Sequence, residues 1–235
     1  MKLSQVMSEL KKCGTAQTRK IYERHGAPES MFGVQVKDLK TIAKKIKDDH
    51  ELACQLYETG NADAMYLAGL IADGGQMTKT ELNRWAKEAS WYMISEYSVP
   101  WVTSDHKDAA GMAVKWMKSK KENVASSGWA TYTALLGTRE DEDLDLKEIK
   151  SLLKQVEKEI AGATGRVRYT MNGFVIAVGS FVQPLLKEAK ATAKKIGKIE
   201  VDMGETSCKV PLATDYIAKV EKMGRVGRKR KAARC

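Results

Sequence analysis

Residues 90–101, SWYMISEYSVPW, place a single carboxylate among large aromatic side chains. If Ser90 caps a helix that begins at Trp91, Tyr92 and Glu96 stand one helical turn apart on the same face. Trp91 then points about 100° away from that face and is expected to pack in the core. A tyrosine ring beside a carboxylate offers a π face and a negative charge, and both favour a cation. The spacing therefore predicts a small cation-binding site at Tyr92 and Glu96.

A simpler interpretation of these residues competes with that prediction. Most glutamates are exposed, so Glu96 taken alone is an ordinary surface acid of a helix. Tryptophans more often pack between helices than bind ligands. We assign this packing role to Trp85, Trp101, Trp116 and Trp129.

Composition limits the classes of protein that are admissible. The chain has 235 residues, of which 43% are hydrophobic and 30% charged, as in a globular protein. No apolar run reaches the roughly 18 residues of a membrane span, and residues 1–14 form an amphipathic helix rather than a signal peptide, so a cytoplasmic location is expected. The four cysteines form no C-x-x-C pair and the histidines are isolated. We therefore expect free thiols, no metal and no disulfide.

Apolar residues recur with helical spacing along most of the chain, whereas strand-like alternation is nearly absent. The pattern predicts helices within residues 36–47, 50–58, 64–73, 81–89, 109–118, 146–160, 172–182 and 213–223. Short glycine-containing joints separate them, and each pair of helices occupies about 35 to 40 residues, the size of a helical-repeat unit. The predicted fold is all-α: a right-handed solenoid of antiparallel helix pairs with a concave face, forming one domain over residues 1–221. A compact bundle is the alternative, and residues 198–210 are expected to be extended.

Positive charge is concentrated at the C-terminus. Residues 222–235 contain no acid and carry seven of the ten net positive charges. Such a segment is expected to be a disordered tail, either merely solvated or attracted to a polyanion such as nucleic acid. The residues assigned to this attraction are Arg225, Arg228, Lys229, Arg230, Lys231 and Arg234.

Three segments in order resemble one family. Ser90-Trp91 and Val99-Pro100 keep the frame of a helix that reads approximately S-W-W-D-x-V-D-x-x-V-P in the AlkD-like DNA alkylation repair proteins, which are HEAT-like-repeat DNA glycosylases. Residues 32–35, FGVQ, followed by KDLKTIAKKI, resemble the entry helix of that family, and residues 172–176, NGFVI, resemble a late helix. The resemblance covers most of residues 20–195.

The resemblance implies a function in DNA alkylation repair. Proteins of that family bind double-stranded DNA along the concave face and release cationic N3- or N7-alkylated purines without metal or cofactor. Carried over to this chain, it makes Glu96 the catalytic carboxylate, with Tyr92 and Phe174 as the aromatic residues that contact the lesion. The candidates for DNA backbone contacts are Lys37, Lys40, Arg166 and Arg168. A monomer that associates with the nucleoid through DNA is expected.

The chain also departs from the family pattern. Glu96 is one methylene longer than the aspartate of the family, and Tyr92 and Phe174 replace tryptophans. Met93 stands where a second acid is common, and Tyr132 stands where the resemblance requires a DNA-contacting arginine. A noncatalytic helical-repeat module that binds DNA or protein and has lost the glycosylase chemistry is therefore the alternative function.

Overall fold

The computed structural model describes residues 1–234, which form thirteen α-helices and no β-strand. The all-α prediction is confirmed. The α-helices are α1 (Leu3–Cys13), α2 (Ala16–Arg24), α3 (Val36–Ile46), α4 (His50–Glu58), α5 (Ala62–Ile71), α6 (Lys79–Glu88), α7 (Val99–Ser104), α8 (Ala109–Met117), α9 (Glu122–Thr138), α10 (Leu146–Glu159), α11 (Gly165–Phe181), α12 (Leu186–Ile196) and α13 (Ala213–Lys222). A π-helix, η1 (Ile94–Ser98), leads directly into α7, and 3₁₀ turns occupy Asp141–Asp143, Ile160–Gly162 and Gln183–Leu185.

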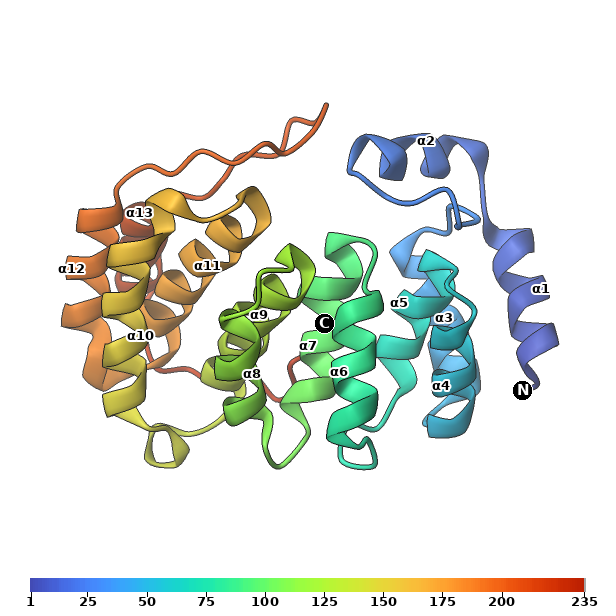
Figure 1. Cartoon of the computed structure of the whole chain (residues 1–235), viewed down its shortest axis with the longest axis horizontal. Helices are drawn as coiled ribbons and strands as arrows, with labels where there is room; N and C mark the ends of the chain where they lie inside the picture. The colour runs from blue at the N-terminus through green and yellow to red at the C-terminus, as the bar shows by residue number, and fades with distance from the viewer. Residues whose placement is uncertain (235) are drawn as a thin grey trace.

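The helices follow one another from α1 at one end to α12 and α13 at the other (Figure 1). An inner row runs through the middle of the molecule, because α5 packs on η1, η1 and α7 pack on α9, and α9 packs on α11. The helices α4, α8 and α12 pack against members of this row and belong to an outer layer with α6 and α10. The face of the inner row that is lined by residues of η1, α7, α9 and α11 is called the groove face below.

Amphipathic spacing explains why these segments are helices. In α10 the buried residues Ile149, Leu152, Leu153 and Val156 follow the i, i+3, i+4, i+7 pattern of one helix face. Asp145 begins this helix by accepting the backbone N–H groups of its first turn. The same logic gives every amphipathic helix one buried and one solvated face.

Two hydrophobic clusters make up the core. The first extends from α1 to the start of α9, and the second extends from α8 to α13. The tryptophans assigned to packing are all buried, which confirms that assignment. Trp85, for example, stacks on the Tyr57 ring at a centroid distance of 3.8 Å.

Gly69 lets α5 approach η1 closely. A Cβ atom at this position would lie 2.5 Å from the Cβ of Ser98, closer than van der Waals contact permits. No side chain can therefore be added here without moving η1, which carries Glu96. The glycine thus helps to fix the position of the candidate site.

Residues 198–210 lie between α12 and α13 without forming a helix, as predicted, and extend toward α2 at the top of Figure 1. Arg168 holds this segment by donating to the carbonyl of Glu200. No single helix within residues 1–234 is long and apolar enough to cross a membrane; α11 and the segment Gln183–Ile196 pass that test only jointly, across a 114° bend.

The C-terminal tail, predicted to be disordered, contacts the rest of the fold over the residues that the structure describes. Residues 223–234 leave α13 and run behind the front helices to the centre of the molecule (Figure 1). Lys229 and Arg234 anchor this segment by ion pairs to Asp141 and Asp105. The basic composition is explained by these contacts as well as by solvation, and Cys235 lies outside the described residues.

Candidate nucleic-acid interface

The helix that carries Glu96 has an unusual backbone. It is helical from Tyr92 and becomes a π-helix over Ile94–Ser98, so that the N–H of Val99 donates to the carbonyl of Ile94. Pro100 has no N–H to donate, and the backbone register changes just before it. π-Helical turns are rare and occur frequently at functional sites. The helix thus begins one residue later than the predicted start at Trp91. The wide π-helical turn directs the Glu96 side chain into the inner row of helices.

Glu96 is paired with Arg166, which lies at the start of α11. The Nε atom of Arg166 donates to Oε1 of Glu96 at 2.7 Å, and its Nη2 atom donates to Oε2. The Glu96 side chain is only 4% exposed. The surface-acid interpretation is therefore wrong. The two parallel bonds form the bidentate geometry in which arginine binds carboxylates most strongly.

Burial and pairing act in opposite directions on this carboxyl group. Burial raises the pKa of Glu96 above its ordinary value, and the hydrogen bonds and charge of Arg166 oppose that rise. The pKa of Arg166 is also raised, because the carboxylate stabilises its positive charge against the effect of burial. The arginine therefore keeps its charge beside Glu96.

Two tyrosine rings enclose the guanidinium of Arg166. Its Cζ atom lies 4.4 Å from the ring centroid of Tyr92 and 4.4 Å from that of Tyr169. The predicted cation site is therefore present, and its occupant is a side chain of the protein itself. Sequence reasoning missed Tyr169, although its spacing of three residues from Arg166 places both on one face of α11.

Phe174 lies elsewhere and does not reach the site. Its side chain is fully buried and makes edge contacts with the rings of Trp129 and Tyr132. In this arrangement Phe174 lies in the core, and its contact with a damaged base stays a prediction. Phe174 is five residues beyond Tyr169, which corresponds to about 140° around an α-helix, and so faces the core.

Arg168 is engaged by the fold, and its predicted contact with a DNA phosphate stays a prediction. Its guanidinium donates to four backbone carbonyls, those of Ile160, Ala161, Ala163 and Glu200. These bonds tie the turn that follows α10 to the 198–210 segment. Lys37 and Lys40 lie on α3, which packs on α1 and α5, and their predicted role in backbone contacts stays a prediction.

Tyr132 occupies the position where the sequence resemblance requires an arginine. Its hydroxyl donates to Glu148 at 2.6 Å, and burial together with that bond raises the pKa of the phenol well above its ordinary value. The side chain is 2% exposed. This position therefore offers no positive charge to DNA.

The FGVQ segment is held by a buried carboxylate. Asp63 accepts the backbone N–H groups of Phe32, Gly33 and Val34 at 2.6 to 3.0 Å. Burial raises the pKa of Asp63, and these three bonds oppose that rise. Gly33 has φ +81°, a conformation that L side chains rarely adopt. The segment is thus a structural joint between α2 and α3.

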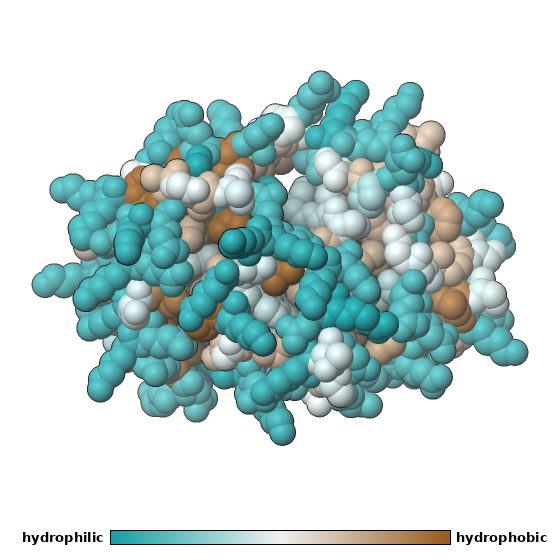
Figure 2. Space-filling view, viewed as in Figure 1, coloured by the Kyte–Doolittle hydropathy of each residue, from teal (hydrophilic) through white to brown (hydrophobic). Residues whose placement is uncertain are grey.

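Two hollows adjoin the ion pair. One, of about 800 Å³, lies between α2 and residues 202–208 and reaches Tyr92 and Arg166. It opens at the upper edge of the molecule in Figure 2. The second, of about 200 Å³, lies on the groove face between Glu96, Tyr169 and Arg230. The described residues hold no group of three or more metal-binding side chains.

The packing of successive helices into an inner row and an outer layer places the chain among helical-repeat proteins, and the sequence comparison defines the class further. Residues 6–191 match the model of the DNA alkylation repair enzyme family. The chain belongs to that family.

Two relatives are Lin0241 of Listeria innocua and Lmo0209 of Listeria monocytogenes, both described as uncharacterized proteins. Each is 33% identical over 221 residues, which cover 92% of this chain and 95% of the relative. A solved structure is 40% identical and covers both chains completely, with a TM-score of 0.91. It is described as a new family of proteins related to the HEAT-like repeat DNA glycosylases with affinity for branched DNA structures. The HEAT-like fold expected from the sequence is therefore confirmed.

Proposed function

We propose that this protein binds DNA, prefers branched over linear duplexes and does not excise bases. The chain is similar over its whole length to a protein described as having affinity for branched DNA. Its family membership supports a role linked to DNA alkylation repair. The protein is thus a DNA-binding module rather than a hydrolase.

The engagement of Glu96 by Arg166 carries this proposal. A glycosylase carboxylate must face the positive charge that develops on the sugar, and such stabilisation requires an electrostatic group that is free to act there. Both oxygens of Glu96 are already bound by Arg166. The guanidinium also fills the space between Tyr92 and Tyr169, so it would repel a cationic base as well as exclude it.

The experiment compares binding and excision on defined substrates. Fluorescently labelled four-way junction DNA and a linear duplex of the same length are titrated with the protein, and methylated duplex DNA is assayed for release of 7-methylguanine and 3-methyladenine. We expect tighter binding to the junction and release equal to the control without protein. Equal affinity for the two DNAs would contradict the preference, and release above the control would contradict the noncatalytic assignment.

A glycosylase acting on cationic N3- or N7-alkylated purines is the second candidate. It is supported by the sequence resemblance, which implies that Glu96 of η1 is the catalytic carboxylate. In that case Arg166 must leave the site when DNA binds. Glu96→Gln should then abolish release, whereas Glu88→Gln, an exposed acid of α6, should not.

A further inference from the structure

The C-terminal segment contains two kinds of basic residue. Lys229 and Arg234 are anchors, because both form ion pairs and donate to backbone carbonyls. The side chain of Lys229 is only 8% exposed. The other basic residues after α13 are exposed: Arg225, Arg228, Arg230 and Lys231. We call these four the strip.

Backbone contacts fix the strip in place. The N–H of Gly227 donates to the carbonyl of Ser180 at 3.0 Å, and the N–H of Arg230 donates to the carbonyl of Gly137 at 2.7 Å. The guanidinium of Arg230 lies 4.9 Å from the Phe181 ring centroid. The strip is therefore attached to α9 and α11 at several points along its length.

The anchors change the electrostatics of this end of the groove face. The C-terminal ends of α9 and α11 expose carbonyl groups that carry the negative end of the helix dipole and would repel a phosphate. The ammonium of Lys229 binds one carbonyl from each helix, those of Leu136 and Phe181, together with the carboxylate of Asp141. Lys229 thus covers these negative groups, and the four residues of the strip stay exposed beside it.

The groove face itself supplies little charge. Its lining between η1, α9 and α11 is neutral, including Tyr97, Thr133 and Gly173, except for Glu96, whose charge is met by Arg166. Arg230 borders this hollow and also the next one, of about 470 Å³, which the other strip arginines line. The helices therefore provide a surface and the tail provides the positive charge.

We infer that the strip is a fixed phosphate-binding element that holds the backbone of DNA against the groove face. The inference deepens the proposed function and rests on it. The strip lies beyond residues 6–191, which match the family model. A fixed row of cations is already ordered before DNA arrives, and less conformational entropy is lost on binding than with a mobile arm.

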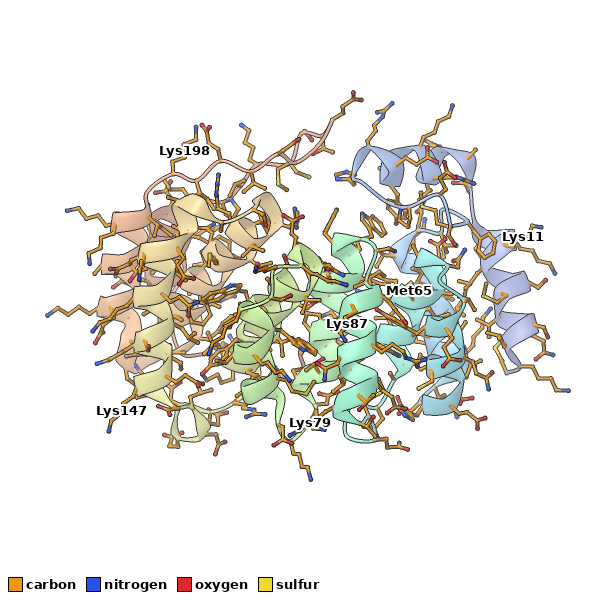
Figure 3. All side chains as sticks on the ribbon, viewed as in Figure 1. Lys11, Met65, Lys79, Lys87, Lys147 and Lys198 are labelled. Atoms are coloured by element: carbon orange, nitrogen blue, oxygen red, sulfur yellow. The ribbon has the colours of Figure 1, made fainter. Side chains whose placement is uncertain are left out.

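The test uses the full chain and a labelled four-way junction, with affinity measured by anisotropy between 50 and 300 mM KCl. The strip variant changes Arg225, Arg228, Arg230 and Lys231 to Gln. The matched control changes four exposed lysines of the outer layer to Gln, Lys147, Lys154, Lys158 and Lys194. Lys147 lies near the lower end of α10 in Figure 3.

The strip variant should lose about tenfold or more in affinity, and the slope of log affinity against log salt should become shallower by up to about 3.6, or 0.9 for each phosphate contact. The control should lose much less. Equal losses of affinity in both variants would overturn the phosphate-binding role of the strip but would leave the proposed DNA binding intact. A wild-type protein that binds no junction would overturn the proposed function and the strip together.

A second variant separates a fixed strip from a mobile arm. Lys229→Met removes the main anchor and keeps all four strip cations, so a fixed strip predicts weaker binding than wild type. Unchanged affinity would overturn the fixed strip in favour of a mobile arm. Tighter binding after deletion of residues 223–235 would overturn it in favour of a tail that competes with DNA for the groove face.

Discussion

Arg166 binds both carboxylate oxygens of Glu96, across 70 residues of sequence, and so joins α11 to η1. The guanidinium of Arg166 lies between the rings of Tyr92 and Tyr169 at the edge of the groove face. It both stabilises the contact between two helices and occupies the site in which a cationic ligand would lie.

Breaking this pair from either side should destabilise the fold. Glu96→Gln and Arg166→Gln should each lower the free energy of unfolding by about 3 kcal/mol, because the partner is left as an uncompensated buried charge. The double variant should lose less than the sum of the two by about 1 kcal/mol or more. Urea denaturation of the four proteins measures the coupling, and strictly additive losses would show that the two side chains act independently.

Asp63 should be essential to the joint between α2 and α3. Asp63→Asn turns an amide donor toward backbone N–H groups that need an acceptor, and we expect a loss of about 2 to 3 kcal/mol in the free energy of unfolding. The control is Asp48→Asn, at an exposed position. A variant as stable as the control would show that the three N–H bonds are dispensable.

The cap of α6 predicts a dependence of stability on pH. The N–H and hydroxyl of Thr78 donate to Glu81, and these bonds lower the pKa of that carboxyl, the N–H contributing more. A carboxyl whose pKa is lowered by folding stabilises the protein above its ordinary pKa, about 4.3, and loses this contribution as pH falls through the folded value.

Glu81→Gln should therefore be less stable than wild type by about 0.5 kcal/mol at pH 7, because glutamine keeps the cap but lacks the charge. The difference should disappear in acid. Thermal unfolding between pH 7 and pH 3 measures it, and Glu88→Gln controls for removing a charge from the same helix. A difference that persists unchanged in acid would refute this account.

Lys229→Met should release the C-terminal segment from the ends of α9 and α11. We expect a loss of about 1 to 3 kcal/mol in stability, as for buried hydrogen bonds to a charged group. Brief trypsin treatment should cleave the freed segment faster than in wild type. Lys231→Met, at an exposed position, is the control, and equal cleavage of the two variants would show that Lys229 is not an anchor.

Local patterns predicted the helices and the buried tryptophans well, because a helix face repeats every few residues and its apolar side must be covered. Contacts between distant residues leave no such pattern. The pairing of Glu96 with Arg166 could not be derived from spacing. The contacts of the tail could not be derived from its basic composition, because the carbonyl groups that it covers belong to α9 and α11. A helical projection of α11 would have placed Phe174 in the core.

Arg234 donates to the carbonyl of Leu70, 164 residues earlier in the chain. The contact therefore encloses most of the helices in one long loop of the chain, and closing so long a loop costs conformational entropy. It can form only when the helices between its two ends have taken their places. Its loss would leave α5 without this link to the C-terminal segment.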